Sequence, residues 1–350
     1  MPIATVAIDL AKDVFELAAA DETGKIIERR RLTRHMLERY FDGLQGIHVI
    51  MEACGTAHYW GRRFGATGLR VSLLPPHYVR PYVRRNKTDS ADATALLEAS
   101  RASDITPVKV KSTEQQGLQG LHRVRSAWRA TRTARINMLR GLCREFGISV
   151  AAGAKRGLTA LRQHLAQESH SIPSCLHSMM LQVSQELSEI DDRLTEVERQ
   201  LRDIAKQSVD CQRLQTIPGI GLIASTAFIG AIGDISAFRN SRRFASWLGL
   251  TPRERSSGSV RHLGSISKRG DGYLRMLLVH GARAVLYSGD AAQRAGRPLD
   301  ALRDWGLQVR ARAGHNKAAV AVANKLARIL WATWSRQRDF EFRSPRPADA

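Results

Sequence analysis

The sequence predicts an α/β domain at its amino end, followed by a basic helical region and a second, mostly helical globular region. Three observations predict this organisation. Short apolar runs bounded by turn residues alternate with helical patterns over the first hundred residues. From about Thr113 the chain becomes helical and strongly basic. Between Leu176 and Ile204, apolar residues recur with alternating spacings of four and three, which is a heptad pattern.

The first region is expected to contain its elements in the order β-β-β-α-β-α-β-α. The strands are expected at residues 5–11, 14–20, 25–32, 47–53 and 69–76. The helices are expected at residues 35–44, 57–68 and about 89–101. The turn sequence "DETG" separates the second strand from the third, and two prolines stop the last strand. Thr88 is expected to cap the last helix.

The heptad pattern allows two interpretations. The seam could pack within the chain as a helical hairpin on the preceding helices, or it could join two chains as a coiled coil. We favour the coiled coil between chains, and we therefore expect a homodimer or a homotetramer.

The second globular region begins near Gln212. The sequence "TIPGIG" places a turn between two helical segments and looks like a helix-hairpin-helix element, whose backbone N–H groups can hold a phosphate. A Gly-, Ser- and Arg-rich loop follows from Thr251, and helices are expected at 273–288 and 316–336. The expected domains are 1–110, 111–210 and 211–340, with a disordered tail at 341–350.

The charge of the chain points to a polyanionic partner. There are 54 Lys and Arg residues against 33 Asp and Glu residues, which gives a net charge of +21. Neutralising phosphates is the commonest use of such a charge. The amino end has no signal-peptide pattern, and the most apolar run, at 221–235, is too short to span a bilayer. The four cysteines have no paired spacing, which argues against a zinc site or disulfides and fits a reducing cytoplasm. We expect a cytoplasmic bacterial protein that acts at the nucleoid.

Arginines recur on more than one face of the helix that begins near Thr113. Such a run can be a solvated charged face, but the net charge favours a surface that contacts the phosphate backbone. The residues expected to contact nucleic acid, in this helix and in the later loop, are Arg123, Arg125, Arg129, Arg132, Arg135, Arg253, Arg255, Arg261, Lys268 and Arg269.

Four acids stand at the ends of expected elements. Asp9 ends the first strand, Glu52 ends the fourth, and Asp89 and Asp92 share one face of the last helix because they are three residues apart. Acids at a helix start alone would favour the macrodipole. The four together match the active-site layout of the ribonuclease-H-like superfamily, in which the first and fourth strands are adjacent.

Four converging carboxylates would raise one another's pKa and resist ionisation. Two Mg²⁺ or Mn²⁺ ions, about 3.5–4 Å apart in such sites, relieve that repulsion and activate an oxygen nucleophile against a phosphodiester. We therefore expect Asp9, Glu52, Asp89 and Asp92 to be both metal ligands and catalytic residues.

The loop "RERSSGSVRHLGSISKRG" contains two neighbouring serines, Ser256 and Ser257, among basic side chains. A serine becomes a useful nucleophile only when its proton is removed and the developing charge is stabilised, and the surrounding cations could hold a scissile phosphate. From the residues alone, a basic DNA-contacting loop with solubilising serines is the favoured interpretation.

The motifs "AIDLAKD", "MEACGTAHYW", "NKTDSADA", "TIPGIG", "GLTPRERSSG" and "SISKRGDGYLR" occur in the order found in the DEDD transposases of insertion sequences, relatives of the Piv/MooV DNA invertases. The resemblance covers residues 3 to about 335. The "EACG" motif looks like one subgroup, in which we expect Cys54 to be a packing residue near the acids.

The resemblance implies a RuvC-like amino-terminal domain, a coiled-coil middle and a carboxy-terminal transposase domain. It implies recombination of donor and target DNA guided by a structured non-coding RNA. The family's nucleophilic serine precedes a glycine and therefore maps onto Ser257, with Ser256 one residue away. The serine would form a covalent phosphoserine, in an active site assembled from the acids of one chain and the serine of another.

Two alternatives remain at the level of sequence. A metal-dependent nuclease or Holliday-junction resolvase without strand exchange would use the four acids but not Ser257; DEDD exonucleases usually have an acid where this chain has Ala11. A non-enzymatic nucleic-acid-binding protein would need only the positive charge, but clustered acids would repel its ligand.

Overall fold

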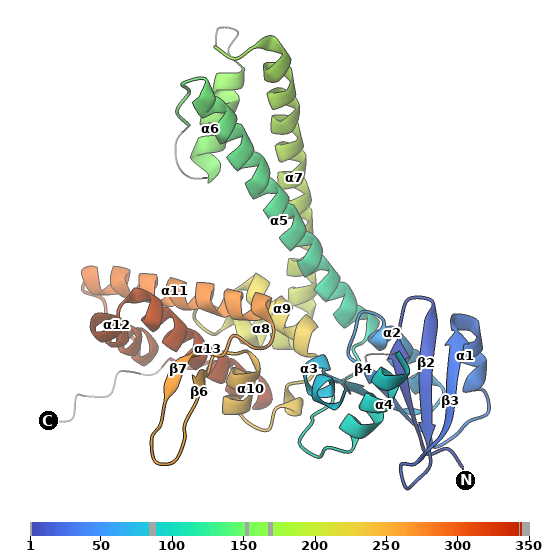
Figure 1. Ribbon diagram of the computed structural model, residues 1–350. Helices are drawn as coiled ribbons and strands as arrows, with labels where there is room; N and C mark the ends of the chain where they lie inside the picture. The colour runs from blue at the N-terminus through green and yellow to red at the C-terminus, as the bar shows by residue number, and fades with distance from the viewer. Residues whose placement is uncertain (1, 84–88, 151–153, 167–170, 343, 345–350) are drawn as a thin grey trace, which may run out of the picture. The chain divides into compact units, whose positions relative to one another are not determined.

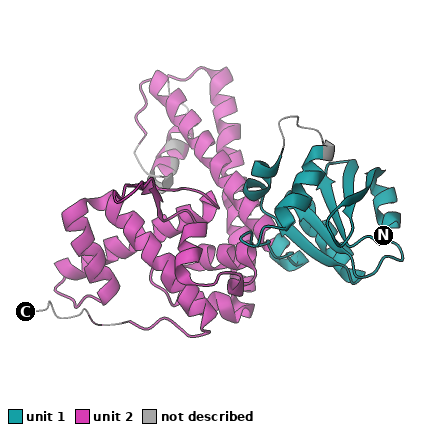
Figure 2. Ribbon diagram, turned by 60° about the horizontal axis from the view of Figure 1, so that its bottom comes forward, with its two compact units in different colours: residues 1–116 teal, residues 117–350 magenta. Residues whose placement is uncertain are grey.

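The computed structural model describes residues 2–83, 89–150, 154–166, 171–342 and 344. The chain forms two compact units, Met1–Gln116 and Gly117–Ala350 (Figure 2). The expected division into three domains stays a prediction. Thr88 and nearly all of the tail expected at 341–350 to be disordered lie outside the described residues, apart from 341, 342 and 344.

The first unit is built on a five-stranded mixed sheet in the order β3-β2-β1-β4-β5 (Figure 1). The first three strands form an antiparallel meander, while β4 is parallel to β1 and β5 is parallel to β4. The predicted meander and the expected adjacency of the first and fourth strands are confirmed. The strands are β1 (Thr5–Leu10), β2 (Val14–Ala20), β3 (Ile26–Thr33), β4 (His48–Glu52) and β5 (Arg70–Leu74).

Helices cover both faces of this sheet. On one face, α1 (Arg34–Tyr40) and α2 (Ala57–Ala66) pack through large side chains such as Trp60. On the other face, α4 (Asp89–Ser100) packs through Leu96 and several alanines. The two prolines after β5 do stop the strand, but they also begin a short helix, α3 (Pro76–Val79), with a 3₁₀ turn at Arg80–Tyr82, since proline is well suited to a first helical turn.

The strands alternate between the two faces. Val6 and Ile8 belong to the core under α2, whereas Ala7 belongs to the core under α4. The α4 side of the sheet is lined by small residues, Ala7, Ala18 and Ala20, beside Ile50. Because alanine side chains are short, they allow α4 to lie close to the strands.

Two long helices dominate the start of the second part of the chain. These are α5 (Thr113–Glu145) and α7 (Ser174–Gln207), with the shorter α6 (Ala154–Leu165) between them (Figure 1). The heptad seam lies on α7 as expected, but its residues pack against α5 of the same chain. Met180 and Leu187 share a core with Ile136 and Leu139, and Leu201 shares one with Leu118.

Ion pairs across the two helices join Arg125 to Glu198, Arg132 to Asp191 and Arg135 to Glu186. Our preference for a coiled coil between chains is therefore wrong for the buried part of this seam. The heptad pattern could not distinguish packing within one chain from packing between two chains, because a heptad seam buries the same positions against any neighbouring helix.

The carboxy-terminal region is a bundle of helices around α13 (His315–Ser335). Val322, Leu326 and Leu330 on that helix are fully buried. The helices are α8 (Val209–Gln215), α9 (Leu222–Ile232), α10 (Ser241–Trp247), α11 (Gly272–Arg294), α12 (Ala301–Ala313) and α13 (His315–Ser335), with a 3₁₀ turn at Ile235–Ala237. None of the helices in the described ranges combines the length and the apolar character that a bilayer crossing needs.

The expected turn between two helical segments at "TIPGIG" is present, between α8 and α9, and its interpretation as a helix-hairpin-helix element stays a prediction. Gly219 in the turn has φ +81°, and its backbone lies against Gly281 in the middle of α11. A Cβ at Gly281 would lie 2.2 Å from the carbonyl oxygen of Gly219. These two glycines let the turn and α11 pack backbone to backbone.

Gly281→Ala is expected to destabilise the protein by about 2–3 kcal/mol, because the added methyl group must push the turn away from α11. Gly141→Ala is the matched control: it also lies within a long helix, but its Cβ would meet nothing within 4 Å. This control should stabilise the protein by about 0.5–1 kcal/mol through helix propensity. Urea unfolding measures both changes, and effects of the same sign would contradict the close approach.

A buried histidine joins three helices of the second unit. His122 on α5 is 5% exposed; its Nδ1 lies 3.0 Å from the hydroxyl of Tyr273 at the start of α11, and its Nε2 lies 3.1 Å from the hydroxyl of Thr226 on α9. Thr226 donates its own proton to the carbonyl of Leu222, so it accepts from Nε2–H. Burial, assisted by Arg125, lowers the pKa of His122 to about 4.

Stability should therefore depend on pH through His122. In the unfolded chain the imidazole binds a proton below about pH 6.5, whereas the folded state resists protonation down to about pH 4. Lowering the pH from 7 to 4.5 should cost wild type about 2–3 kcal/mol more than it costs His122→Gln. His280→Gln, at an exposed position of α11, is the control and should follow wild type in urea unfolding at the two pH values. Identical losses in wild type and His122→Gln would refute this assignment.

Candidate active site

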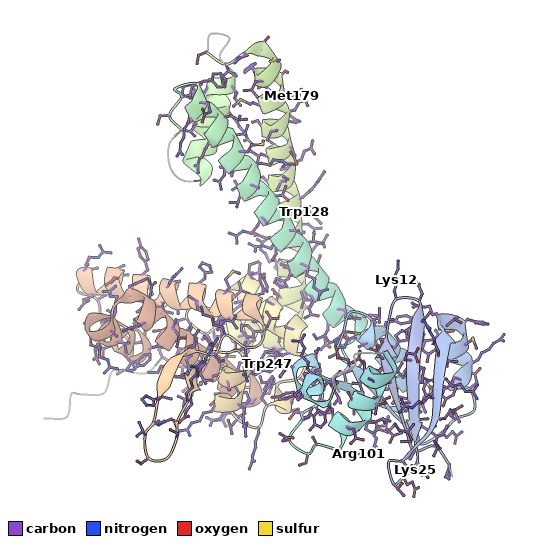
Figure 3. The ribbon with its side chains drawn as sticks, viewed as in Figure 1. Lys12, Lys25, Arg101, Trp128, Met179 and Trp247 are labelled. Atoms are coloured by element: carbon purple, nitrogen blue, oxygen red, sulfur yellow. The ribbon has the colours of Figure 1, made fainter. Side chains whose placement is uncertain are left out.

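Asp9 and Glu52 lie beside each other at one end of the first sheet. Ile8 pairs with Met51 in the parallel ladder of β1 and β4, and the two acids are the next residue on each strand. Both are half-buried. Since Ala7 and Ile50 face α4 and strand side chains alternate, Asp9 and Glu52 also lie on the α4 face. Lys12, in the turn after Asp9, marks this end of the sheet, and Lys25 marks the other (Figure 3).

The helix α4 brings further acids to the same face. Asp92 is half-buried and lies three, four and seven residues before Ala95, Leu96 and Ala99, which pack on the sheet. Asp89 is the first residue of α4, and its backbone position shares that face because it precedes Asp92 by three residues; its side chain lies outside the described part of the structure.

The donor set fits a hard divalent cation in its chemistry, because it offers carboxylate oxygens alone. Within the described residues, no three His, Cys, Asp or Glu side chains are gathered as a metal cluster. The structure thus brings Asp9 and Glu52 together and puts Asp92 on the helix that packs over them. The binding of a metal stays a prediction.

One acid of this face was missed in the sequence. Glu16 on β2 is the direct cross-strand partner of Asp9, and it shares the face of Ala18 and Ala20. Its carboxylate pairs with Arg31 on β3 at 3.4 Å. The signal was available in "VFELAAA", where a single acid alternates with small residues that face the same side.

Cys54 follows Glu52 closely, and its N–H donates to the carbonyl oxygen of Glu52 at 2.8 Å. Its side chain packs against the core between the sheet and α2, as expected for a packing residue. All four cysteines are free thiols.

The serine-containing segment is a β-hairpin, whereas we expected a loop. Its strands are β6 (Pro252–Glu254) and β7 (Leu263–Ile266). The hairpin continues beyond them, because Ser257 and Val260 exchange two backbone hydrogen bonds of 3.2 Å around Gly258, which has φ +57°. Ser257 is therefore the last paired residue before a tight turn. The many glycines and serines concealed the strands, since these residues have low strand propensity.

The two serines have different surroundings. The Ser256 hydroxyl donates to the carboxylate of Glu254 at 2.8 Å and accepts from the His262 N–H at 3.3 Å. The Ser256 hydroxyl and Arg261 together lower the pKa of Glu254. Ser257 is exposed, and within the described residues its hydroxyl makes no hydrogen bond. Of the two serines, Ser257 is thus the one whose hydroxyl oxygen is free to react with a bound ligand.

Five of the ten basic residues predicted to contact nucleic acid have an ion-pair or hydrogen-bond partner within the protein. Arg125, Arg132 and Arg135 bind acids on α7 and hold the helical pair together. In the hairpin, Arg261 pairs with Glu254, and Arg253 donates to the Ser267 carbonyl at 3.3 Å. The side chains of the remaining five are exposed: Arg123, Arg129, Arg255, Lys268 and Arg269. For all ten residues, contact with nucleic acid stays a prediction.

Two parts of the chain match known family models. Residues 6–147 match DEDD_Tnp_IS110, described as "Transposase", and residues 211–295 match a model described as "Transposase IS116/IS110/IS902 family". The first match includes Asp9, Glu52, Asp89 and Asp92, and the second includes Ser257.

Full-length relatives agree with these matches. The chain is 40% identical to the "Probable family 20 transposase" of Pseudomonas aeruginosa, with 96% of this chain and 98% of the relative covered. It is 39% identical to the "Transposase for insertion sequence element IS1111A" of Coxiella burnetii, with 97% and 91% covered. It is also 25% identical to the "Pilin gene-inverting protein" of Moraxella bovis, with 85% and 83% covered.

Proposed function

Because the chain belongs to the IS116/IS110/IS902 family of transposases, we propose that it cuts and rejoins DNA with a carboxylate metal site and a serine nucleophile. The observation that carries the proposal is the adjacency of Asp9 and Glu52 under α4. The strand order and this placement support an RNase-H-like, or RuvC-like, amino-terminal domain.

Asp9, Glu52, Asp89 and Asp92 are the residues that would hold Mg²⁺ or Mn²⁺, as two ions. When bound, the ions would offset the repulsion among these carboxylates and stabilise negative charge on a phosphodiester. Of the basic residues expected to contact nucleic acid, the five exposed ones, Arg123, Arg129, Arg255, Lys268 and Arg269, would hold the strands.

Ser257 would act as the nucleophile. Its oxygen attacks the scissile phosphorus and loses its proton, while the bond between phosphorus and one sugar oxygen breaks and that oxygen takes up a proton. The products are a phosphoserine and a free sugar hydroxyl. Attack by a sugar hydroxyl of another strand reverses the step, releases the serine and joins the strands in a branched junction. Ser257 suits this role because it lies exposed at the hairpin turn, while Ser256 is held by Glu254.

We further propose that a structured RNA guides the choice of donor and target DNA, and that a homodimer or homotetramer supplies the acids and the serine from different chains. The positive charge of the protein supports binding to both nucleic acids. Since the heptad seam is largely buried within the chain, other surfaces would have to hold the oligomer. We also propose that the chain belongs to the E-A-C-G subgroup of the family, and this assignment rests on the "EACG" motif alone.

The test is reconstitution. Purified protein, Mg²⁺, the RNA transcribed from the flank of the element, and labelled donor and target duplexes are incubated together. Recombinant DNA and a protein–DNA adduct that survives denaturation are expected, and both should disappear when EDTA is added. Cut products without adduct or rejoining would favour the alternative, a metal-dependent nuclease or Holliday-junction resolvase.

A further inference from the structure

A strongly basic stretch surrounds the serine hairpin and includes a helix that our sequence prediction passed over. From Arg239 to Arg269 the chain contains a single acid, Glu254, and eight Lys or Arg residues. The acid is already paired with Arg261. Three of these eight basic residues, Arg239, Arg242 and Arg243, lie on or just before α10.

These three side chains are exposed and available. α10 turns Phe244 and Ala245 into the core and leaves Arg239, Arg242 and Arg243 at the surface. Over the ranges that the structure describes, none of the three guanidinium groups has an ion-pair or hydrogen-bond partner. They differ in this respect from the arginines of α5 that are neutralised by acids of α7. Unpaired arginines attract phosphate far more effectively than paired ones.

The positive charge of this surface comes from the arginine side chains and not from the backbone N–H groups at the N-terminus of α10. Asn240 caps α10, and its side-chain oxygen accepts from the backbone N–H groups of Arg242 at 3.1 Å and Arg243 at 3.0 Å. Those N–H groups are thereby used within the protein. A ligand of α10 must bind the guanidinium groups themselves.

The helix α10 is fastened to the base of the serine hairpin. The N–H of Lys268 donates to the carbonyl of Gly249 at 3.1 Å, and the Arg275 guanidinium donates to the carbonyls of Leu248 and Arg269 at 3.1 and 3.2 Å. At the carboxyl end of α10, Trp247 (labelled in Figure 3) approaches Gly270 so closely that a Cβ there would lie 1.9 Å from its carbonyl oxygen. The α10 arginines are therefore held in fixed relation to the strands of the hairpin.

We propose that Arg239, Arg242 and Arg243 bind the phosphate backbone of the DNA strand on which Ser257 acts, away from the scissile phosphate, because Ser257 lies at the turn of the hairpin and α10 at its base. The proposal rests on the function proposed for Ser257 in one respect, the choice of DNA as the occupant. A DNA strand bound at Ser257 extends beyond the hairpin over a neighbouring part of the protein surface. The helix α10 is joined directly to the hairpin base, and its arginines carry the positive charge that complements the phosphates of the strand.

The test uses the full-length protein and a fluorescent duplex spanning an end of the element. Affinity is measured by anisotropy over a range of salt concentrations for wild type and for the double variant Arg242→Gln, Arg243→Gln. The slope of log affinity against log salt should decrease in magnitude by about 0.9 for each lost phosphate contact, or about 1.8 for the pair. Both positions are exposed, so the fold should be retained.

The matched control is Arg193→Gln with Arg199→Gln. These arginines are exposed and make the same change in charge, but they pair with acids on their own helix, α7. The control should keep the wild-type slope. An unchanged slope in the α10 variant, or equal losses in both variants, would overturn the proposal. A loss on single-stranded RNA without a loss on the duplex would overturn the choice of DNA.

The two proposals fail separately. If wild type forms no serine-linked adduct yet shows an α10-dependent slope, the nucleophile proposal fails and α10 stands as a surface that binds duplex DNA. If the α10 variant forms adduct and binds duplex with the wild-type slope, the surface proposal fails and the nucleophile stands.

Discussion

Ser257→Ala is expected to abolish both the covalent protein–DNA adduct and the recombinant product. Without the hydroxyl no phosphoserine can form, so the residual rate should be lower by a factor of about 10⁴ or more, at the detection limit of a gel assay. DNA binding should stay within about twofold of wild type, because the side chain is small, exposed and without a hydrogen bond inside the described part of the chain.

Ser256→Ala is the neighbouring control. It removes the hydrogen bond to Glu254 and the acceptor for the His262 N–H, and both groups are exposed at the hairpin surface. A loss of activity of about tenfold or less is expected from the loosened hairpin, with adduct still formed. If Ser256→Ala eliminates the adduct and Ser257→Ala does not, the assignment of the nucleophile is reversed.

Asp92→Asn is expected to lower the rate of DNA cleavage by about 10³-fold, equivalent to about 4 kcal/mol of transition-state stabilisation. The amide keeps the size of the side chain and its place on the α4 face, but it loses the charge that a divalent cation requires. Asp9→Asn should have an effect of similar size, because that residue lies beside Glu52 in the ladder.

Asp42→Asn provides the comparison for charge alone, since Asp42 is exposed just after α1 and ahead of β4, whereas Glu52 lies at the far end of that strand. It should cleave at the wild-type rate. Duplex affinity should be retained or raised in Asp92→Asn, because removing a negative charge favours a polyanion. Cleavage by Asp92→Asn and Asp9→Asn at the rate of Asp42→Asn would exclude the proposed metal site.

Much of the first unit could be predicted from sequence because its signals are local. The apolar runs between turn residues predicted all five strands, and the ends of each predicted strand lie within a few residues of the ends in the structure. The adjacency of the first and fourth strands came from the layout of acids, and the ladder from Thr5–His48 to Ile8–Met51 confirms it. Glu16 was missed because its importance depends on register: only pairing with Asp9 brings it to the acidic end of the sheet.

The second unit was harder, since its decisive features are pairings between distant residues. Arg125 and Glu198 are far apart in sequence, so the run of arginines gave no sign of which members were neutralised. The serine hairpin depends on backbone pairing between residues such as Ser257 and Val260 that have weak strand propensity. The arginines of α10 could have been found from the lack of acids between Arg239 and Arg253.

The alanine-lined face beneath α4 has a consequence for synthesis of the protein. Asp9 and Glu52 are translated early. The helix α4, which covers their face of the sheet, is the last helix packed on this sheet to leave the ribosome. Until α4 docks on Ala7, Ala18 and Ala20, the two strand acids lack the helix that carries their partners. We therefore expect a chain terminated before α4 to lack the proposed acidic site, and even a chain that includes α4 awaits the serine hairpin for the proposed strand exchange.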